Sequence, residues 1–245
     1  MPEIFEILTE HIQQEKLVAL ATVIAGPGLG SKLLIWPDGA SQGSLGTDSL
    51  NQQIIQRTRE LFHAMEPERL SLEVSGEMVE IFIEIFPPPA RLVIIGAVHI
   101  AIPLVRFAKT LNLHTIVIDP RSAFATRERF PGVDELIVQW PVEALNALNI
   151  NESTFIVTLS HDEKLDNPAL EVALNSPARY IGSLGSRKTH AKRVSALKAA
   201  GLTEEQINRI HAPIGLNIAA RGAAEIALSI IAQIVAVDHG IDRNL

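Results

Sequence analysis

The first 86 residues carry a pattern of apolar positions that predicts a small α+β domain. Apolar side chains recur at helical spacing over Glu3–Gln14, and a second helix is expected from Asp48, as its capping residue, to about Met65. Short apolar runs bounded by turn residues predict five strands. These strands are Leu17–Ile24, Lys32–Trp36, Gln42–Leu45, Leu70–Val74 and Met78–Phe86.

The pattern changes after three consecutive prolines, Pro87 to Pro89. Such a segment is stiff and cannot continue a helix or a central strand, so it predicts a domain boundary. We expect an N-terminal domain over residues 1–86, a proline linker over 87–90 and a C-terminal domain over 91–245. Charge supports this division, because residues 1–89 hold 13 acidic and 5 basic side chains whereas residues 90–245 hold 15 and 16.

The second half alternates short apolar runs with segments of helical length. The runs are Leu92–Ile95, Thr115–Ile118, Leu136–Val138, Phe155–Thr158 and Tyr180–Ile181. This alternation is typical of a parallel sheet with right-handed crossovers. The predicted fold is therefore α/β, with a C-terminal Rossmann-like parallel sheet that has helices on both faces, preceded by the smaller α+β domain. The last apolar stretch, Ile218–Val237, contains Arg221 and Glu225 and is interpreted as a buried helix rather than a membrane span.

Composition excludes several classes of protein. The 245 residues are 47% hydrophobic and 20% charged, which is typical of a soluble globular protein that buries a core without metals or disulfides. The net charge of −7, with only 8 Phe, 2 Trp and 1 Tyr, argues against nucleic acid as a partner. No cysteine is present, which excludes disulfides, cysteine-bound zinc, iron–sulfur clusters and a thiolate nucleophile.

Targeting and catalytic motifs are missing from the sequence. The first residues lack a basic and apolar leader, so we expect a cytoplasmic protein that does not insert into membranes. Neither an HExxH motif nor EF-hand spacing occurs, so no metal site is predicted. No complete set of catalytic residues is evident, which leaves enzymatic activity open and favours a binding role.

The turn Gly96-Ala97-Val98-His99-Ile100-Ala101 stands where a dinucleotide-binding G-x-G-x-x-G/A turn would lie. Gly96 allows a tight turn, and His99 is a candidate to face the pocket. Asp119 ends the next strand, where a carboxylate can accept hydrogen bonds from ribose hydroxyls. However, Val98 replaces the second glycine, which would let the backbone touch a pyrophosphate. The turn is therefore either a plain turn of a degenerate Rossmann domain or part of a pocket for a different ligand.

The stretch Tyr180 to Lys188 is the strongest candidate for a binding site. A strand leads into a turn with two glycines and two serines, Gly182, Ser183, Gly185 and Ser186, and then into a helix that begins with Arg187 and Lys188. Exposed amides at a helix start beside basic side chains can hold a phosphate. The alternative is a capped, solvated helix with ordinary surface lysines.

Histidines near strand ends provide further candidates. Ser160-His161-Asp162 follows a predicted strand, where loops of an open α/β sheet line the ligand crevice. His161 is a candidate donor to a phosphate or a pterin-like ring, whereas Asp162 is placed to cap the next helix. His211, in a turn before the last helix, is more often structural.

Taken together, several stretches resemble the XdhC/CoxI family, accessory factors for xanthine dehydrogenase and related molybdoenzymes. The resemblance is most specific in the pair GSLGSRK and HAPIGL, and looser in the N-terminal stretches ALATVIAGPG and DGASQGSLG. Further matching stretches are RLVIIGAVHIA, VIDPRSAFATRERFP, SHDEKLDNPALEVAL, GLTEEQINRIHAPIGLNIAA and EIALSIIAQIVA.

This resemblance implies a protein that binds molybdenum cofactor (molybdopterin), protects it during sulfuration by a separate sulfurtransferase, and delivers it to an apo-molybdoenzyme of the xanthine dehydrogenase type. It implies cofactor-binding residues in three segments. These are Gly96, Ala97, His99, Asp119 and Arg121; Ser160, His161 and Asp162; and Gly182, Ser183, Gly185, Ser186, Arg187 and Lys188. The chain departs from the family at Gly43 to Ser49, which lacks the family's cysteine, and at Val98.

Other functions remain open at this stage. A NAD(P)- or FAD-dependent oxidoreductase is suggested by Gly96 and Asp119 and weakened by Val98. A scaffold with a relic pocket would use the acidic N-terminal domain as its partner surface. A homodimer is also expected, because Ile218–Val237 and the strand Val79–Phe86, apolar on both faces, offer more apolar surface than one small domain hides.

Overall fold

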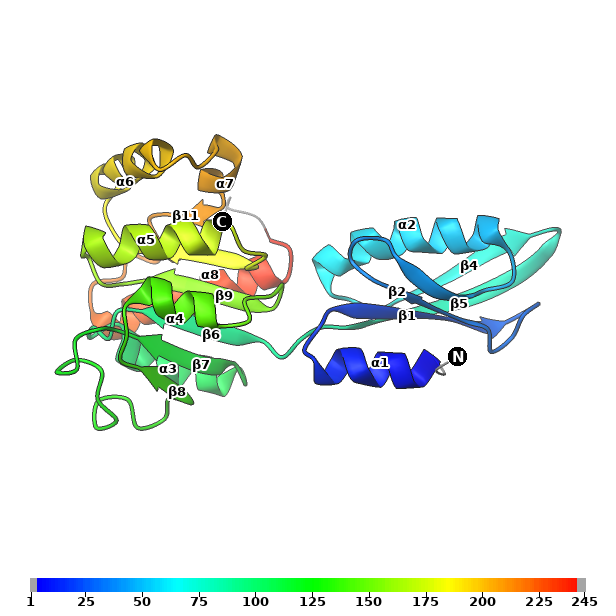
Figure 1. Ribbon diagram of the computed structural model, residues 1–245, viewed down its shortest axis with the longest axis horizontal. Coiled ribbons are helices and arrows are strands. Elements are labelled where there is room, and N and C mark those ends of the chain that lie inside the picture. Colours follow the sequence, from blue (N-terminus) through cyan, green and yellow to red (C-terminus); the bar gives the residue numbers. More distant parts are fainter. Residues whose placement is uncertain (1–3, 242–245) are drawn as a thin grey trace. The chain divides into compact units, whose positions relative to one another are not determined.

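The computed structural model describes residues 4–241 (Figure 1). Contacts along the chain divide it into two compact units, Met1–Pro88 and Pro89–Leu245. Glu3, the predicted start of the first helix, and the predicted domain ends at residues 1–3 and 242–245 lie outside the described residues. Within the described range, no helix has both the length and the apolar character needed to cross a membrane.

The first unit is built on a five-stranded antiparallel sheet with the strand order β3-β2-β1-β5-β4. The strands are β1 (Val18–Ala25), β2 (Lys32–Ile35), β3 (Ser41–Ser44), β4 (Glu68–Val74) and β5 (Glu77–Phe86). One helix covers each face, as Figure 1 shows: α1 (Ile4–Gln13) on one side and α2 (Asp48–Ala64) on the other. The prediction of a small α+β domain is confirmed.

Alternation in β2 explains how two helices share this sheet. Leu33 and Ile35 are buried in the same cluster as the apolar face of α2, whereas Leu34 between them packs with Leu8 of α1. Successive side chains of a strand point to opposite faces, so one strand can serve two cores. The start of α2 differs from the prediction: Thr47, not Asp48, is the capping residue, and its Oγ1 accepts a hydrogen bond from the Leu50 amide at 3.3 Å.

The second unit holds a six-stranded parallel sheet with the order β11-β10-β9-β6-β7-β8. Its strands are β6 (Arg91–Ile95), β7 (His114–Ile118), β8 (Glu135–Ile137), β9 (Thr154–Thr158), β10 (Tyr180–Ser183) and β11 (Ile210–His211). Counted from β6, this is the order 3-2-1-4-5-6 of a doubly wound Rossmann sheet. The predicted Rossmann-like fold is therefore confirmed, and the strand order reverses between β6 and β9.

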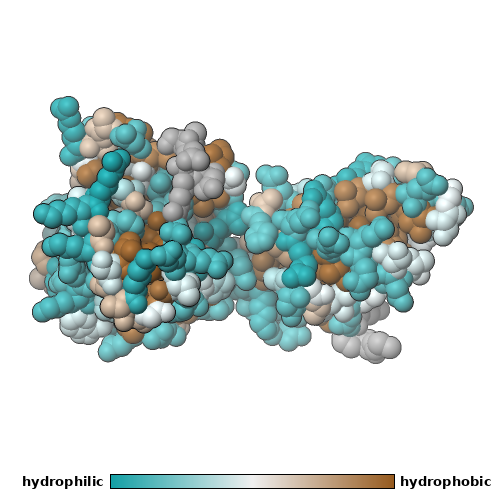
Figure 2. All heavy atoms as spheres, turned by 90° about the horizontal axis from the view of Figure 1, so that it is seen from above, coloured by the Kyte–Doolittle hydropathy of each residue, from teal (hydrophilic) through white to brown (hydrophobic). Residues whose placement is uncertain are grey.

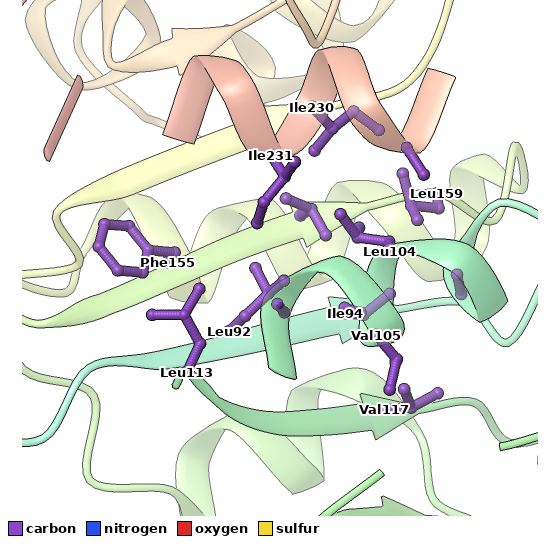
Figure 3. Packing of buried hydrophobic residues seen from close by; sticks show 14 of the residues in the cluster. Leu92, Ile94, Leu104, Val105, Leu113, Val117, Phe155, Leu159, Ile230 and Ile231 are labelled. Atoms are coloured by element: carbon purple, nitrogen blue, oxygen red, sulfur yellow. The ribbon is translucent and has the colours of Figure 1, made fainter. Parts of the chain in front are cut away.

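Helices cover both faces of this sheet. On one face lie α3 (Ala101–Thr110) and α8 (Ala223–Asp238), whose apolar side chains pack with Leu92, Ile94 and Phe155 (Figure 3). The other face packs against α4 (Pro141–Ala147), α5 (Glu163–Leu174), α6 (Arg187–Ala199) and α7 (Glu204–Asn208). Because both faces are buried, the strands read as continuous apolar runs in the sequence.

The last helix is shorter than predicted. It begins at Ala223 rather than Ile218, because Ala219 adopts a left-handed backbone (φ +57°) and the Glu225 carboxylate accepts a hydrogen bond from the Arg221 amide at 2.7 Å. Most of its apolar surface is hidden within the unit, so it offers less support for a dimer than the sequence suggested. Leu228 and Ile218 remain about half exposed.

We expect Ile230→Ala to destabilise the second unit by ~3 kcal/mol, because Ile230 is completely buried between α8 and the sheet. Hydrogen exchange of the β6 and β9 amides, followed by mass spectrometry, should then be about 100-fold faster. The matched variant Leu228→Ala, on the exposed side of the same helix, should change stability by less than about 0.5 kcal/mol. Equal effects of the two variants would contradict the packing described above.

Candidate functional site

Loops at the carboxyl ends of four neighbouring strands form the candidate site. They are the turn after β6, the loop after β7, the loop after β9 and the turn after β10, and they contain the three predicted segments. In open α/β sheets, ligands bind outside the carboxyl ends of the strands where the strand order reverses. Here that point lies between Gly96 and Ser160.

Gly96 is required at this point by a close approach of two backbones. A Cβ built on Gly96 would lie 2.9 Å from the Ser160 amide nitrogen, closer than real side chains allow, and its φ of +103° also favours glycine. The Gly96 amide donates to the Ile118 carbonyl at 2.8 Å. The first glycine of the predicted turn thus joins the ends of β6, β7 and β9.

Asp119 is completely buried, and its carboxylate is fully used within the chain. It accepts hydrogen bonds from the Ala97 amide (2.8 Å), the Arg121 amide (2.9 Å), and Arg121 Nε and Nη2 (2.8 and 2.7 Å). Burial alone would raise the pKa of Asp119, but the hydrogen bonds from Arg121 and Ala97 lower that pKa below its ordinary value. A carboxylate has about four acceptor positions. The ribose contact predicted for Asp119 therefore has no acceptor left to it in this structure.

The remaining residues of this turn point in different directions. Val98 is half-buried and packs on the core cluster below the turn, whereas His99 is exposed. The Arg121 guanidinium also lies over the Phe124 ring, 4.5 Å from its centroid. Asp119 raises the pKa of Arg121, and the more distant Asp162, in the loop after β9, and Asp166, in α5, raise that pKa a little further.

The loop after β9 contains a residue in an unusual conformation. His161 has a left-handed backbone (φ +60°) and an exposed side chain. On its two sides, the Ser160 hydroxyl accepts the Asp162 amide hydrogen bond at 3.0 Å, and Asp162 accepts from the Lys164 amide to cap α5. The capping role predicted for Asp162 is confirmed. A left-handed histidine at a strand end is costly and is often retained for function.

A buried ion pair lies beneath this loop, and sequence reasoning did not assign it to the site. Asp166 accepts a hydrogen bond from the Ser160 hydroxyl at 2.6 Å, and its other oxygen lies 3.8 Å from Arg193 Nη2 of α6. Burial raises the pKa of Asp166 despite Ser160 and Arg193, and burial lowers the pKa of Arg193 despite Asp166. Nε and Nη1 of Arg193 are buried without a hydrogen-bond partner among the described residues.

The sequence did contain a signal for this pair. Asp166 lies at helical spacing with the buried Ala169, Leu170 and Ala173, and Arg193 lies four residues before the buried Leu197. A charged residue on the apolar stripe of a helix indicates a buried partner, because an unpaired buried charge is very costly.

The turn after β10 presents free cations at the start of α6. Ser186 caps the helix and accepts the Thr189 amide hydrogen bond at 3.1 Å. Arg187 and Lys188 are exposed and form no hydrogen bond or ion pair with any described residue, and the first turn of α6 has no acidic side chain. Figure 2 shows hydrophilic side chains, with hydrophobic ones among them, on the upper face of the second unit. This end of α6 is therefore suited to an anion.

Gly182 and Ser183, also predicted to bind the ligand, lie inside the sheet. The Ser183 hydroxyl shares a hydrogen bond of 2.6 Å with Thr158 of β9. A Cβ on Gly182 would lie 2.5 Å from Ile214 and 2.7 Å from Tyr180. Gly182 and Ser183 are therefore buried residues that support the turn. Its outer part is formed by Gly185 (φ +146°), Ser186, Arg187 and Lys188. No group of acidic and histidine side chains suited to a metal ion occurs within residues 4–241.

Comparison with protein families gives two matches. Residues 92–234 match the profile described as the XdhC Rossmann domain, and residues 11–73 match the profile of the XdhC and CoxI family. Together these matches cover most of both units.

Individual relatives agree with the family profiles. The chain is 28% identical over 200 residues to a Bacillus subtilis protein described as a probable subunit of xanthine dehydrogenase, covering 82% of this chain and 53% of the relative. It is 35% identical over 88 residues to the molybdenum cofactor insertion chaperone PaoD of Escherichia coli, covering 36% of this chain and 28% of the relative. The chain therefore spans about half the length, or less, of these curated relatives.

Solved structures include one with the same fold. A crystal structure from Bacillus halodurans, described as a xanthine dehydrogenase, superposes over 97% of this chain and 96% of its own with a TM-score of 0.56 at 21% identity. At this identity the likeness concerns the fold alone.

We expect Arg121→Ala to destabilise the protein by ~3 kcal/mol at pH 7, because it leaves the buried Asp119 carboxylate without its charged partner. The folded-state pKa of Asp119 lies below its unfolded value of about 4, so this stabilisation is present above that value and is lost as the pH falls through the folded pKa. Urea denaturation at several pH values should show a gap between wild type and variant that narrows on acidification. The exposed control Arg106→Ala should show little effect at any pH, and a gap independent of pH would contradict this role of Arg121.

Proposed function

Since the chain belongs to the XdhC and CoxI family, we propose that it binds molybdenum cofactor at the carboxyl edge of its parallel sheet and assists the insertion of that cofactor into a xanthine dehydrogenase-type enzyme. The observation that carries the proposal is the uncompensated pair Arg187 and Lys188 at the capped start of α6, in a protein of net charge −7. The relative named as a molybdenum cofactor insertion chaperone supports the class of cargo.

The residues present fit this cargo. Molybdopterin carries a phosphate and a pterin ring that forms hydrogen bonds, and the molybdenum it binds supplies redox chemistry to the enzyme that receives it. Arg187, Lys188 and the first amides of α6 would hold the phosphate. His161 and Asp162, exposed on the neighbouring loop, would offer polar groups to the part of the ligand that bears molybdenum. Ser160, whose hydroxyl is engaged with Asp166 and with the Asp162 amide, would act by positioning this loop. No protein thiolate is available to bind molybdenum, because the sequence has no cysteine.

The remaining predicted residues would act by positioning. Gly96 brings the two loops together, and Asp119 with Arg121 fixes the turn that includes Ala97 and His99. In this proposal the chain is a carrier with no catalytic residue of its own. Its partners would be the apo-molybdoenzyme and the sulfurtransferase that modifies the bound cofactor.

A nicotinamide-dependent oxidoreductase fits the site less well. The strand order suits a dinucleotide, but the Asp119 carboxylate already holds four donors and the Val98 side chain stands in the place of the second glycine. Both features occupy the half of the sheet where an adenosine would bind.

Arg187→Glu should lower the amount of molybdenum cofactor that copurifies with the protein at least tenfold. The estimate follows from the loss of a charged hydrogen bond of about 1.5–3 kcal/mol and the addition of a like charge. After coexpression with the cofactor pathway, pterin is measured by fluorescence of its oxidised form and molybdenum by mass spectrometry. The control Lys192→Glu makes the same charge change on the exposed surface of α6. Equal cofactor content in both variants, or none in the wild type, would contradict the proposal.

A further inference from the structure

A cavity of about 280 Å³, lined in part by Arg187, lies between the loop that follows β11 and α8. Its walls include Pro213, Leu216 and Val237, and its polar lining includes His211, Asn217 and Gln233. The volume is close to the lower end of the range for small-molecule sites. The cavity lies entirely within the second unit, and only Arg187 belongs both to it and to the predicted cofactor-binding residues.

The amide of Gln233 is held in one orientation. Its Oε1 accepts hydrogen bonds from the Tyr180 hydroxyl at 2.6 Å and from the Gly215 amide at 2.8 Å. Two donors identify this atom as the oxygen, so the other end of the amide is the NH₂ group. No described residue accepts a hydrogen bond from that NH₂ group. Because Gln233 lines the cavity and its Oε1 is held by two donors, its NH₂ group is the part of the side chain left to donate to a ligand there.

The surrounding walls are equally well fixed. The loop lies so close to α8 that a Cβ on Gly215 would stand 2.4 Å from Ser229 Oγ, and the Leu216 amide donates to the Ser229 carbonyl at 3.1 Å. The His211 ring is stacked on Tyr180, with centroids 4.7 Å apart and an angle of 18° between the planes. A flat ligand would thus meet a preformed site, which lowers the entropic cost of binding.

Charge selects an anionic ligand. Arg187 lines the cavity and pairs with no described residue, and none of the described residues that line it is acidic. Apolar walls, a fixed NH₂ donor and a cation at the rim together suit a planar heterocycle that has acceptor atoms on its ring and carries an anionic group.

We propose that this cavity holds the pterin ring of the cargo while Arg187 contacts the anionic group attached to that ring. This inference rests on the proposed function and adds where the ring lies: between the loop after β11 and α8, rather than in the crevice between β6 and β9. Arg187 joins the two regions, because it begins α6 and also reaches the cavity.

The test uses the full chain and pterin-6-carboxylate, a fluorescent and anionic pterin. Ala236→Leu adds three carbon atoms, one methine and two methyl groups, to the cavity wall, and Ala224→Leu makes the same change on an exposed part of α8 that does not line the cavity. Quenching titrations should give a Kd about tenfold higher for Ala236→Leu and unchanged for Ala224→Leu.

A second variant tests the charge of the ligand. Asn217→Asp, at an exposed position that tolerates the change, should also weaken binding, because the added carboxylate repels an anionic pterin. The effect should be stronger at low salt, where this repulsion is less screened.

Several results would overturn the inference. These are absence of saturable pterin binding to the wild type, the same Kd for Ala236→Leu and Ala224→Leu, and tighter binding of GMP or of inorganic phosphate alone in place of the pterin. Cofactor that copurifies normally with Ala236→Leu would reject the ring position and leave the proposed function intact. Wild-type protein that carries no cofactor after coexpression would instead reject the proposed function.

Discussion

The candidate site depends on one buried carboxylate. Asp119, at the end of β7, accepts hydrogen bonds from the Ala97 amide of the neighbouring turn and from both the backbone amide and the guanidinium of Arg121. It therefore connects the loops that follow β6 and β7. The turn after β6 also lies close against Ser160, which is possible because Gly96 has no side chain. Because an unpaired buried charge is costly, loss of the Arg121 contact would also disturb the geometry of the turn, and loss of the turn geometry would disturb that contact. The shape of the crevice follows from this constraint.

The two halves of the parallel sheet differ in the charged groups that they leave unpaired. Polar groups at the strand ends are engaged with one another in both halves, as Asp119 with Arg121 and Thr158 with Ser183 illustrate. In the half formed by β9, β10 and β11, the cations at the start of α6 are uncompensated, and the cavity beside Gln233 is open. The unpaired cations therefore lie beside the second half of the sheet, which is where the anionic cargo would bind in the function proposed above.

The buried pair Asp166 and Arg193 supports the loops after β9 and β10, in the second half of the parallel sheet. Its contact of 3.8 Å is long, and the guanidinium keeps two buried nitrogens without a partner among the described residues. Such a pair adds little to stability, because desolvation offsets the attraction of the charges. Its effect is on position: Ser160 is hydrogen-bonded to Asp166, and Arg193 donates to the Leu184 carbonyl at 3.2 Å, so the loops after β9 and β10 share one anchor.

The sequence by itself determined the order of elements, the change of pattern at the prolines, the Rossmann-like sheet and the basic, serine-capped turn, because periodicity, capping and turn chemistry act over a few residues. It also carried a family resemblance that the matched profiles confirm. Only the tertiary structure decided that Arg121 occupies the Asp119 carboxylate, that Asp166 and Arg193 are buried partners, and that Arg187 shares a cavity with α8. Asp119 and Arg121 are only two residues apart, but a local pattern does not specify that their side chains turn toward each other. The other two arrangements arise only when the strands take their places in the sheet and bring distant segments together.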